Sequence, residues 1–371
     1  MKYLDEFRDA ALAEHISASI TREATSSSGY RLMEFCGGHT HAISRYGITD
    51  LLPATIRLIH GPGCPVCVLP VGRINQAVRL VQQRDVILCT YADVLRVPCS
   101  GQMSLMRARS EGADVRMIYS TKNALQVARE NPERQVVFFA IGFETTTPPT
   151  AVAVKQAHAS GMENFSILCN HVLTPAAMQA ILSVRTGKML DGFVGPAHVS
   201  TVIGSKPYER FAAEHSKAVV IAGFEPLDVM QAILMLVRQI NQGRATVENE
   251  FSRAVTREGN LKAQKLVAEV FELRDAFEWR GLGSISESAL KLRPEFSRFD
   301  AELKFGVDYV PVRDHKACEC AAVLCGEKRP QECRIFGTVC TPENPVGSCM
   351  VSSEGACAAY YSYGRFREEL T

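Results

Sequence analysis

Two cysteines three residues apart are the first feature of the chain that could do chemistry. Cys64 and Cys67 follow the apolar run Ile56–Ile59 and a turn rich in glycine and proline, His60–Gly63. The run reads as a buried strand, so the thiols are expected at a carboxyl end, where open α/β sheets bind ligands. A C-x-x-C is a redox pair or half of a metal site. No second C-x-x-C occurs, which argues against zinc; two inert thiols remain the alternative.

A second group of reactive residues follows the expected strand Arg31–Phe35. It is the sequence Cys36–His41, in which two glycines permit a tight turn and a close approach of ligand. A helix is expected next, and a thiol at a helix N-terminus has a lowered pKa, which favours the thiolate of Cys36. His39 and His41 could bind a metal ion, relay protons or bond to an anion. A packed cysteine with surface histidines explains the same residues.

A third group, Gly142–Thr147, follows the expected strand Gln135–Ile141. Glu144 could act as a base or ligand, and Thr145 and Thr146 could donate to an anion. Helix capping by a threonine is the alternative. Three further polar residues end expected strands and are predicted to line the same cleft, unless they are structural: His171, His198 and Glu225.

Cysteine is over-represented towards the C-terminus. The chain has 13 cysteines, and seven of them lie at or after Cys318. Cys318, Cys333, Cys340 and Cys357 are separated by 14, 6 and 16 residues. Zinc ribbons use two close pairs of ligands, whereas four thiolates from loops suit an iron–sulfur cluster. The spacing therefore favours a cluster, with zinc as the competitor.

The elements that must position these groups form a regular series. Apolar runs and helical segments alternate, which predicts parallel strands joined by helices. The strands are expected near residues 31–35, 56–60, 86–90, 115–119, 135–141, 165–170, 192–194 and 218–222.

The starts of these strands recur at matching intervals, which predicts two similar four-stranded units. The fold class is α/β: two small parallel-sheet domains around a cleft, plus a helical and cysteine-rich C-terminal domain. Helices are expected over residues 3–24, 227–242, 247–255 and 260–271. The predicted divisions are an N-terminal helix and linker (1–29), two α/β domains (30–131 and 132–235) and the C-terminal domain (236–371).

Composition excludes several classes of function. The 41 basic and 40 acidic residues give a net charge of +1, so no overall field attracts nucleic acid or a membrane surface. No window approaches 18 apolar residues, and the N-terminal sequence does not read as a signal peptide, so a cytoplasmic protein is expected. The chain has neither a P-loop nor a G-x-G-x-x-G sequence.

Four of these sequences, taken in order, resemble the HypD family of NiFe-hydrogenase maturation factors. They are Cys36–His41, His60–Cys67, Gly142–Thr146 and Val351–Cys357. The resemblance extends to about Tyr363 and so covers almost the whole chain. It implies two similar α/β domains and a C-terminal domain that carries a 4Fe-4S cluster.

The resemblance also implies roles for individual residues. Cys36 would be the main thiolate on an iron ion, with Cys64 and Cys67 as a redox-active pair close to that iron and able to bind it. Gly142–Thr146 would face them across the cleft, and His39, His41, Thr145 and Thr146 could donate to cyanide. The cluster would be held by Cys318, Cys333, Cys340 and Cys357, with Cys320 as a possible substitute for Cys318.

Partners follow from the same resemblance. The iron would receive two cyanides and one carbon monoxide in a complex with a small HypC-type protein. HypE would supply cyanide together with HypF, and the finished group would pass to the hydrogenase large subunit. Such a chain is a scaffold with redox activity rather than an ordinary turnover enzyme. The competing hypotheses are a cluster-dependent thiol–disulfide oxidoreductase acting on a protein, and a zinc-stapled interaction protein.

Overall fold

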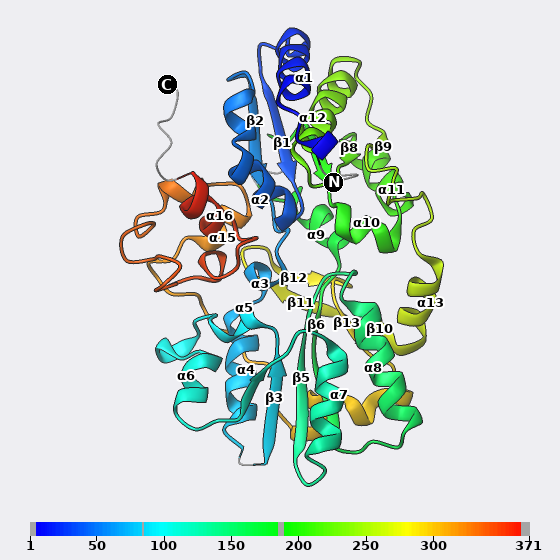
Figure 1. Ribbon diagram of the computed structural model, residues 1–371, viewed down its shortest axis with the longest axis vertical. Coiled ribbons are helices and arrows are strands. Elements are labelled where there is room, and N and C mark those ends of the chain that lie inside the picture. The colour runs from blue at the N-terminus through cyan, green and yellow to red at the C-terminus, as the bar shows by residue number, and fades with distance from the viewer. Residues whose placement is uncertain (1–4, 84, 185–188, 365–371) are drawn as a thin grey trace.

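The chain folds around two parallel β-sheets. The structure is a computed structural model that describes residues 5–83, 85–184 and 189–364. Sheet A lies in the upper half of Figure 1 and sheet B in the lower half. Sheet A has the order β2-β1-β7-β8-β9, and sheet B has the order β4-β3-β5-β6. The predicted fold class, α/β with two parallel-sheet units, is confirmed.

Except for β9, the strands of the two sheets also agree with the predicted apolar runs. Sheet A contains β1 (Tyr30–Glu34), β2 (Ile56–His60), β7 (Gly192–Gly195), β8 (Ala218–Ile221) and β9 (Val247–Asn249). Sheet B contains β3 (Val86–Thr90), β4 (Val115–Met117), β5 (Gln135–Gly142) and β6 (Phe165–His171). β3 and β6 are buried along their whole length, as expected for parallel strands covered by helices on both faces.

The strands do not pair in the predicted groups. β1 pairs with β2 on one edge and with β7 on the other, while β3 pairs with β4 and β5. Sheet A is therefore built from two distant segments, and sheet B lies between them in sequence. The predicted division into residues 30–131 and 132–235 does not match these sheets. Strand spacing gives the length of each connection, but it does not say which sheet edge receives the next strand.

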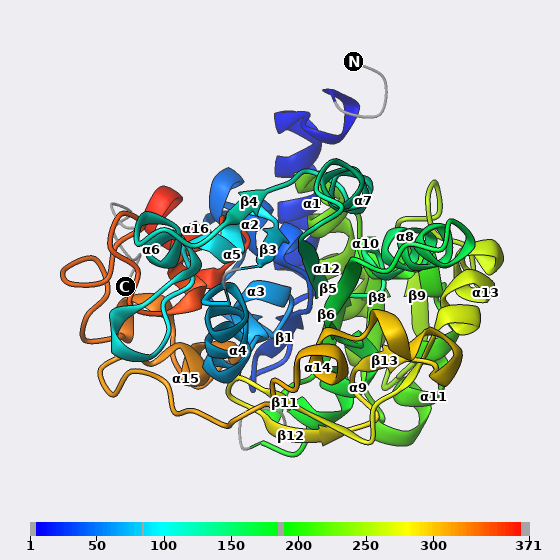
Figure 2. The same cartoon turned by 90° about the horizontal axis from the view of Figure 1, so that it is seen from below.

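Helices cover both faces of each sheet. On sheet A, α12 packs against β7 and β8, and α1 packs against α12. α2 also contacts α12, and α11 contacts β8 and β9. On sheet B, Figure 2 shows α4 and α6 on one side of the strands and α7 and α8 on the other. These helices are α1 (Ala10–Glu23), α2 (Gly37–Tyr46), α4 (Val71–Val81), α6 (Leu105–Ser110), α7 (Thr121–Glu130), α8 (Thr147–Ala159), α11 (Lys206–His215) and α12 (Pro226–Asn241).

Shorter helices complete the fold. The helix predicted over residues 3–24 is present as α1 after a 3₁₀ turn at Asp5–Phe7, and residues 1–4 lie outside the described part. No helix in the described residues is long and apolar enough to cross a membrane. The remaining helices are α3 (Pro65–Val68), α5 (Ala92–Leu95), α9 (Thr174–Ile181), α10 (Ala197–Ile203), α13 (Leu261–Val270), α14 (Ala301–Phe305), α15 (Cys320–Leu324) and α16 (Ala356–Tyr363).

The segment after α12 is divided between the two sheets. The helix predicted over 247–255 is wrong, because residues 247–249 form β9 on the edge of sheet A. The helix predicted over 260–271 is confirmed as α13, which packs on α8. Two antiparallel pairs follow: β10 (Phe271–Leu273) with β13 (Leu290–Leu292), and β11 (Ala276–Trp279) with β12 (Gly283–Ser286). Residues 236–371 therefore do not form one separate domain.

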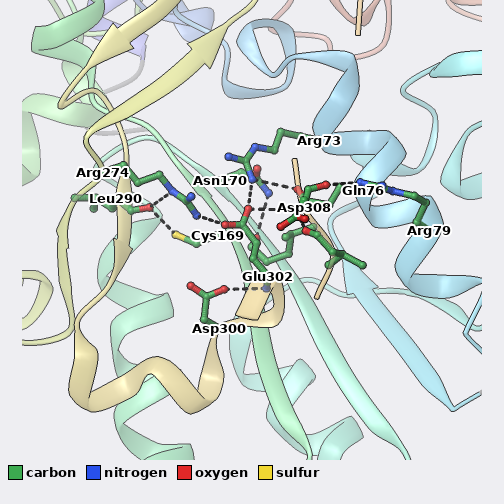
Figure 3. Close-up of polar contacts among 12 residues, drawn as sticks. Arg73, Gln76, Arg79, Cys169, Asn170, Arg274, Leu290, Asp300, Glu302 and Asp308 are labelled. Carbon is green, nitrogen blue, oxygen red and sulfur yellow. Dashed lines mark hydrogen bonds and ion pairs between the residues drawn. The ribbon is translucent and has the colours of Figure 1, made fainter. Parts of the chain in front are cut away.

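A largely buried ionic network fastens the segment after β13 to α4, one of the helices on sheet B. Glu302 of α14 pairs with Arg73 of α4, and its second oxygen accepts from Arg274 at 2.8 Å. Figure 3 shows both guanidinium groups converging on this one carboxylate. Gln76 of α4 also donates to the carbonyl of Val307 at 2.6 Å. Helices far apart in sequence are thus held together by specific polar contacts.

Candidate thiol site

The loops that carry Cys36 and the C-x-x-C meet at the carboxyl ends of β1 and β2. The amide of Gly37 donates to the carbonyl of Gly63 at 3.0 Å, and the amide of Gly61 donates to the carbonyl of Glu34 at 2.9 Å. A Cβ on Gly63 would lie 2.4 Å from the nitrogen of Cys36. Only glycine permits this approach, so the structure brings the two predicted cysteine loops together.

Cys36 lies where the strand order of sheet A reverses, between β1 and β7. Open α/β sheets bind ligands at such switch points. Its thiol accepts hydrogen bonds from the amides of Gly38 and His198, at the starts of α2 and α10. Burial, with Glu354 close by, nevertheless raises the pKa of Cys36 to about 12. The predicted helix N-terminus is present, but the predicted lowering of the pKa is wrong because desolvation outweighs it.

The buried carboxylate of Glu34 makes contacts with both loops. Glu34 is fully buried; it accepts hydrogen bonds from the amide of Cys36 at 3.1 Å and from the hydroxyl of Thr40. Nδ1 of His60 lies 2.7 Å from Oε1 of the same carboxylate, the oxygen that also accepts from Thr40. Glu34 therefore links the end of β1, the start of α2 and the end of β2.

The two histidines of the first loop have different environments. His39 is buried; its Nε2 lies 3.0 Å from the carbonyl oxygens of Ala222 and Gly223, and burial lowers its pKa. Its ring packs against Phe224. His41 is partly exposed and lies 3.4 Å from the carbonyl of Ser353. His39 thus joins α2 to the backbone that follows β8, while His41 faces the C-terminal segment.

The third predicted group lies at the end of β5, and α3 packs against this strand. Both oxygens of Glu144 accept from Thr174, from the amide at 2.9 Å and the hydroxyl at 3.0 Å, and burial raises its pKa to about 7. Thr146 donates to the carbonyl of Phe143 at 3.0 Å, and Thr145 is half-buried. Glu144 and Thr146 therefore both make local structural contacts.

The other predicted strand-end residues, His171, His198 and Glu225, also make contacts within the fold. Nε2 of His171 lies 2.9 Å from the hydroxyl of Thr150, and the ring is buried. Glu225 caps α12 and pairs with Arg8 at 2.9 Å. His198 contributes its amide to Cys36, while its ring packs 4.2 Å from that of Phe224.

A continuous set of thiols runs from the C-x-x-C into the C-terminal segment. The amide of Cys67 lies 3.3 Å from Sγ of Cys64, and the Cys67 thiol contacts that of Cys349. Cys349 in turn contacts Cys320 and Cys357. Burial raises the pKa of Cys67, whereas hydrogen bonds from the thiols of Cys320, Cys357 and Cys67 lower the pKa of Cys349.

The four predicted cluster cysteines do not all lie close to one another. Cys318 contacts Cys320, Cys340 lies close to both, and Cys357 contacts Cys320 and Cys349. Cys333 instead lies beside Glu319. Within the described ranges, no three His, Cys, Asp or Glu side chains converge in a geometry that would hold a metal ion. The all-thiol donor set suits an iron–sulfur centre, and Cys333 is the member that stands apart.

Comparison with known proteins decides the family. A family model described as the hydrogenase formation hypA family, HypD, matches residues 11–364. The chain belongs to the HypD family. It is 64% identical over 373 residues to a hydrogenase maturation factor HypD of Cupriavidus necator, covering 99% of this chain and 98% of that protein. It is 44% identical to the corresponding factor of Escherichia coli K12, covering 100% of both.

Membership in the HypD family gives this chain a role in hydrogenase maturation. Two residues of the site had no sequence signal beyond their type. Glu34 is an isolated acid at the end of an apolar strand, and Cys349 is one of several cysteines in a loop-rich segment. Their positions became visible only once the loops were placed next to one another.

Proposed function

We propose that this HypD-family chain is the scaffold on which iron receives its cyanide and carbon monoxide ligands. Cys36 would hold the iron in a complex with a HypC-type protein. HypE with HypF would supply cyanide, and the hydrogenase large subunit would receive the product. The observation that carries the proposal is the contact between the Cys36 loop and the Cys64–Cys67 loop at the switch point of sheet A.

The residues around Cys36 suit a soft, thiolate-bound metal. Low-spin iron with cyanide and carbon monoxide prefers sulfur donors. The raised pKa of Cys36 means that iron binding must displace a proton from the thiol. Glu354 is the acidic group whose charge acts most strongly on this thiol, and burial raises its own pKa. Glu354 is therefore placed to take up that proton.

The Cys64–Cys67 pair would supply two electrons beside the iron. Oxidation of the two thiols to a disulfide releases two electrons and two protons. Cys349 and Cys320 connect this pair to Cys318 and Cys357 by thiol contacts. A 4Fe-4S cluster, when bound by Cys333, Cys340, Cys357 and Cys318 or Cys320, would exchange single electrons there.

Infrared spectroscopy of the chain purified with its HypC-type partner tests the proposal. We expect cyanide and carbon monoxide bands for the wild type and their loss in Cys36→Ala, because the iron loses its thiolate. Cys89→Ala is the matched control, since Cys89 is buried in β3 within sheet B. Retention of both sets of bands in a folded Cys36→Ala protein would contradict the proposed role.

The continuous thiol contacts also favour a second candidate, a cluster-dependent thiol–disulfide oxidoreductase. That function requires only the Cys64–Cys67 pair, Cys349 and the cluster, and it has no use for Cys36. Iron analysis distinguishes the two functions. Four irons per chain, together with turnover of a protein disulfide that survives Cys36→Ala, would favour the oxidoreductase.

A further inference from the structure

Phe224 packs against both of the helix starts that meet at the Cys36 thiol. It lies in the loop between β8 and α12 and is partly buried. Its ring centroid lies 4.2 Å from that of His198 and 5.1 Å from that of His39. A Cβ on Gly38 would lie 2.5 Å from Cε1 of Phe224. The ring therefore contacts the first turn of α2 and the first turn of α10.

These two helix starts supply hydrogen bonds to Cys36. Its Sγ accepts from the amide of Gly38 in α2 and from the amide of His198 in α10. α2 follows β1 whereas α10 follows β7, so the two donors come from distant parts of the chain. Neither helix by itself sets the distance between them. Because the ring of Phe224 contacts both donor residues, its packing helps to set that distance.

The loop that carries Phe224 is fixed on both sides of the ring. On one side, the amide of Gly223 donates to the carboxylate of Glu250 at 3.1 Å. On the other side, Glu225 caps α12 and accepts a hydrogen bond from Arg8 at 2.9 Å. Arg8 lies just before α1, so the N-terminal segment contributes directly to the position of this loop.

A stack of side chains makes a second connection to the N-terminal segment. Cζ of Arg253 lies 4.0 Å from the ring centroid of Phe7 and 4.4 Å from that of Phe251. A guanidinium group is attracted to the faces of both rings. The ring of Phe251 in turn lies 6.5 Å from that of Phe224. Phe7 is thus linked to Phe224 through Arg253 and Phe251.

We propose that Phe224 is a positioning residue that keeps two backbone amides aligned on the Cys36 thiol. The N-terminal segment, through Phe7 and Arg8, holds the ring in this place. Without the ring, the starts of α2 and α10 would be free to separate, and the thiol would become accessible. The inference rests on the role of Cys36 in the proposed function, where an ordered thiol gives the iron one defined environment.

Alkylation of the full-length chain with iodoacetamide, under anaerobic conditions, tests the inference. Mass spectrometry follows the Cys36 peptide, and the peptide of Cys89, which is buried in β3 of sheet B, is the internal reference. In Phe224→Ala we expect Cys36 to react roughly tenfold faster, because loss of a packed ring favours local opening by that order or more. We expect the rate of Cys89 to stay unchanged, whereas a general loss of stability would raise both rates.

Three further variants sharpen the test. Phe224→Leu keeps a large apolar side chain, and we expect it to restore most of the protection of Cys36. Arg8→Met removes the ion pair with the Phe224 loop, and we expect the Cys36 rate to rise about twofold, the order expected for one exposed pair. Arg238→Met is the matched control, because it removes a similar pair with Glu23 at the other end of α12. We expect this control to leave the Cys36 rate unchanged.

The outcomes separate this inference from the function on which it rests. Absence of cyanide and carbon monoxide bands from the wild-type complex would overturn the proposed function, while the alkylation rates would still decide the role of Phe224. An unchanged Cys36 rate in Phe224→Ala, or an equal rise for Cys36 and Cys89, would overturn only the role of Phe224. If Phe224→Ala does not fold, Arg8→Met decides: a Cys36 rate above that of Arg238→Met supports the inference, and an equal rate rejects it.

Discussion

Glu144 is a carboxylate that the sequence marks for chemistry and that the fold buries. Its oxygens accept both donors of Thr174, and burial raises its pKa from an ordinary 4.5 to about 7. Between these values the folded state keeps a proton that the unfolded state releases. Stability therefore falls as the pH rises through this window and is constant with respect to Glu144 above it.

We expect the free energy of unfolding of the wild type to fall, relative to Glu144→Gln, between pH 4.5 and about 7. The full shift corresponds to roughly 3 kcal/mol. Urea unfolding of both proteins at several pH values measures the difference. Glu111→Gln is the control, because Glu111 is exposed beside Arg107. Equal pH dependence of the wild type and Glu144→Gln would rule out the raised pKa of Glu144.

The helix α14 is only five residues long, so its own hydrogen bonds contribute little to its stability. Its position depends on Glu302, whose carboxylate faces Arg73 and Arg274 (Figure 3). Asp300 caps the helix by accepting from the amide of Glu302 at 2.8 Å. Tertiary contacts therefore maintain this element.

Glu302→Ala leaves two largely buried arginines without their carboxylate. We expect it to destabilise the chain by about 3 kcal/mol, the order found when one partner of a buried pair is removed. Glu111→Ala breaks an exposed pair with Arg107, and we expect a change of about 0.5 kcal/mol or less. Denaturant unfolding compares the two variants; equal effects would show that the Glu302 network contributes nothing.

At the scale of the whole molecule, sheet B is continuous in sequence and sheet A is not. The four strands of sheet B lie within residues 86–171, while sheet A joins strands within 30–60 to strands within 192–249. β1 is a central strand of sheet A only because β7 occupies its second edge. A fragment of the chain can therefore contain every strand of sheet B and none of sheet A, whereas a fragment with every strand of sheet A must also include sheet B.

We expect a fragment of residues 71–184 to fold cooperatively, because it contains every strand of sheet B together with α4, α6, α7 and α8. A fragment of residues 30–131 contains parts of both sheets and completes neither, so we expect no cooperative thermal transition. Circular dichroism during heating measures both. Cooperative folding of residues 30–131 would contradict the strand pairing.

The sequence by itself determines much of this protein. Apolar runs located the strands, and the predicted helices over 227–242 and 260–271 are present as α12 and α13. Local patterns suffice for these features because strand and helix periodicities involve residues close together in the chain. The sequences Cys36–His41 and His60–Cys67 likewise indicated a site at strand ends and led to the HypD family.

Only the tertiary structure decided how the pieces combine. Pairing of β1 with β7 joins residues about 160 positions apart, and no local pattern encodes which sheet edge a strand joins. The pKa of Cys36 depends on burial by distant segments, which overrides its helix-terminal position. The contact between Cys67 and Cys349 likewise arises when distant loops pack together. Sequence thus supplied the reactive groups, and long-range packing set their neighbours and their acidity.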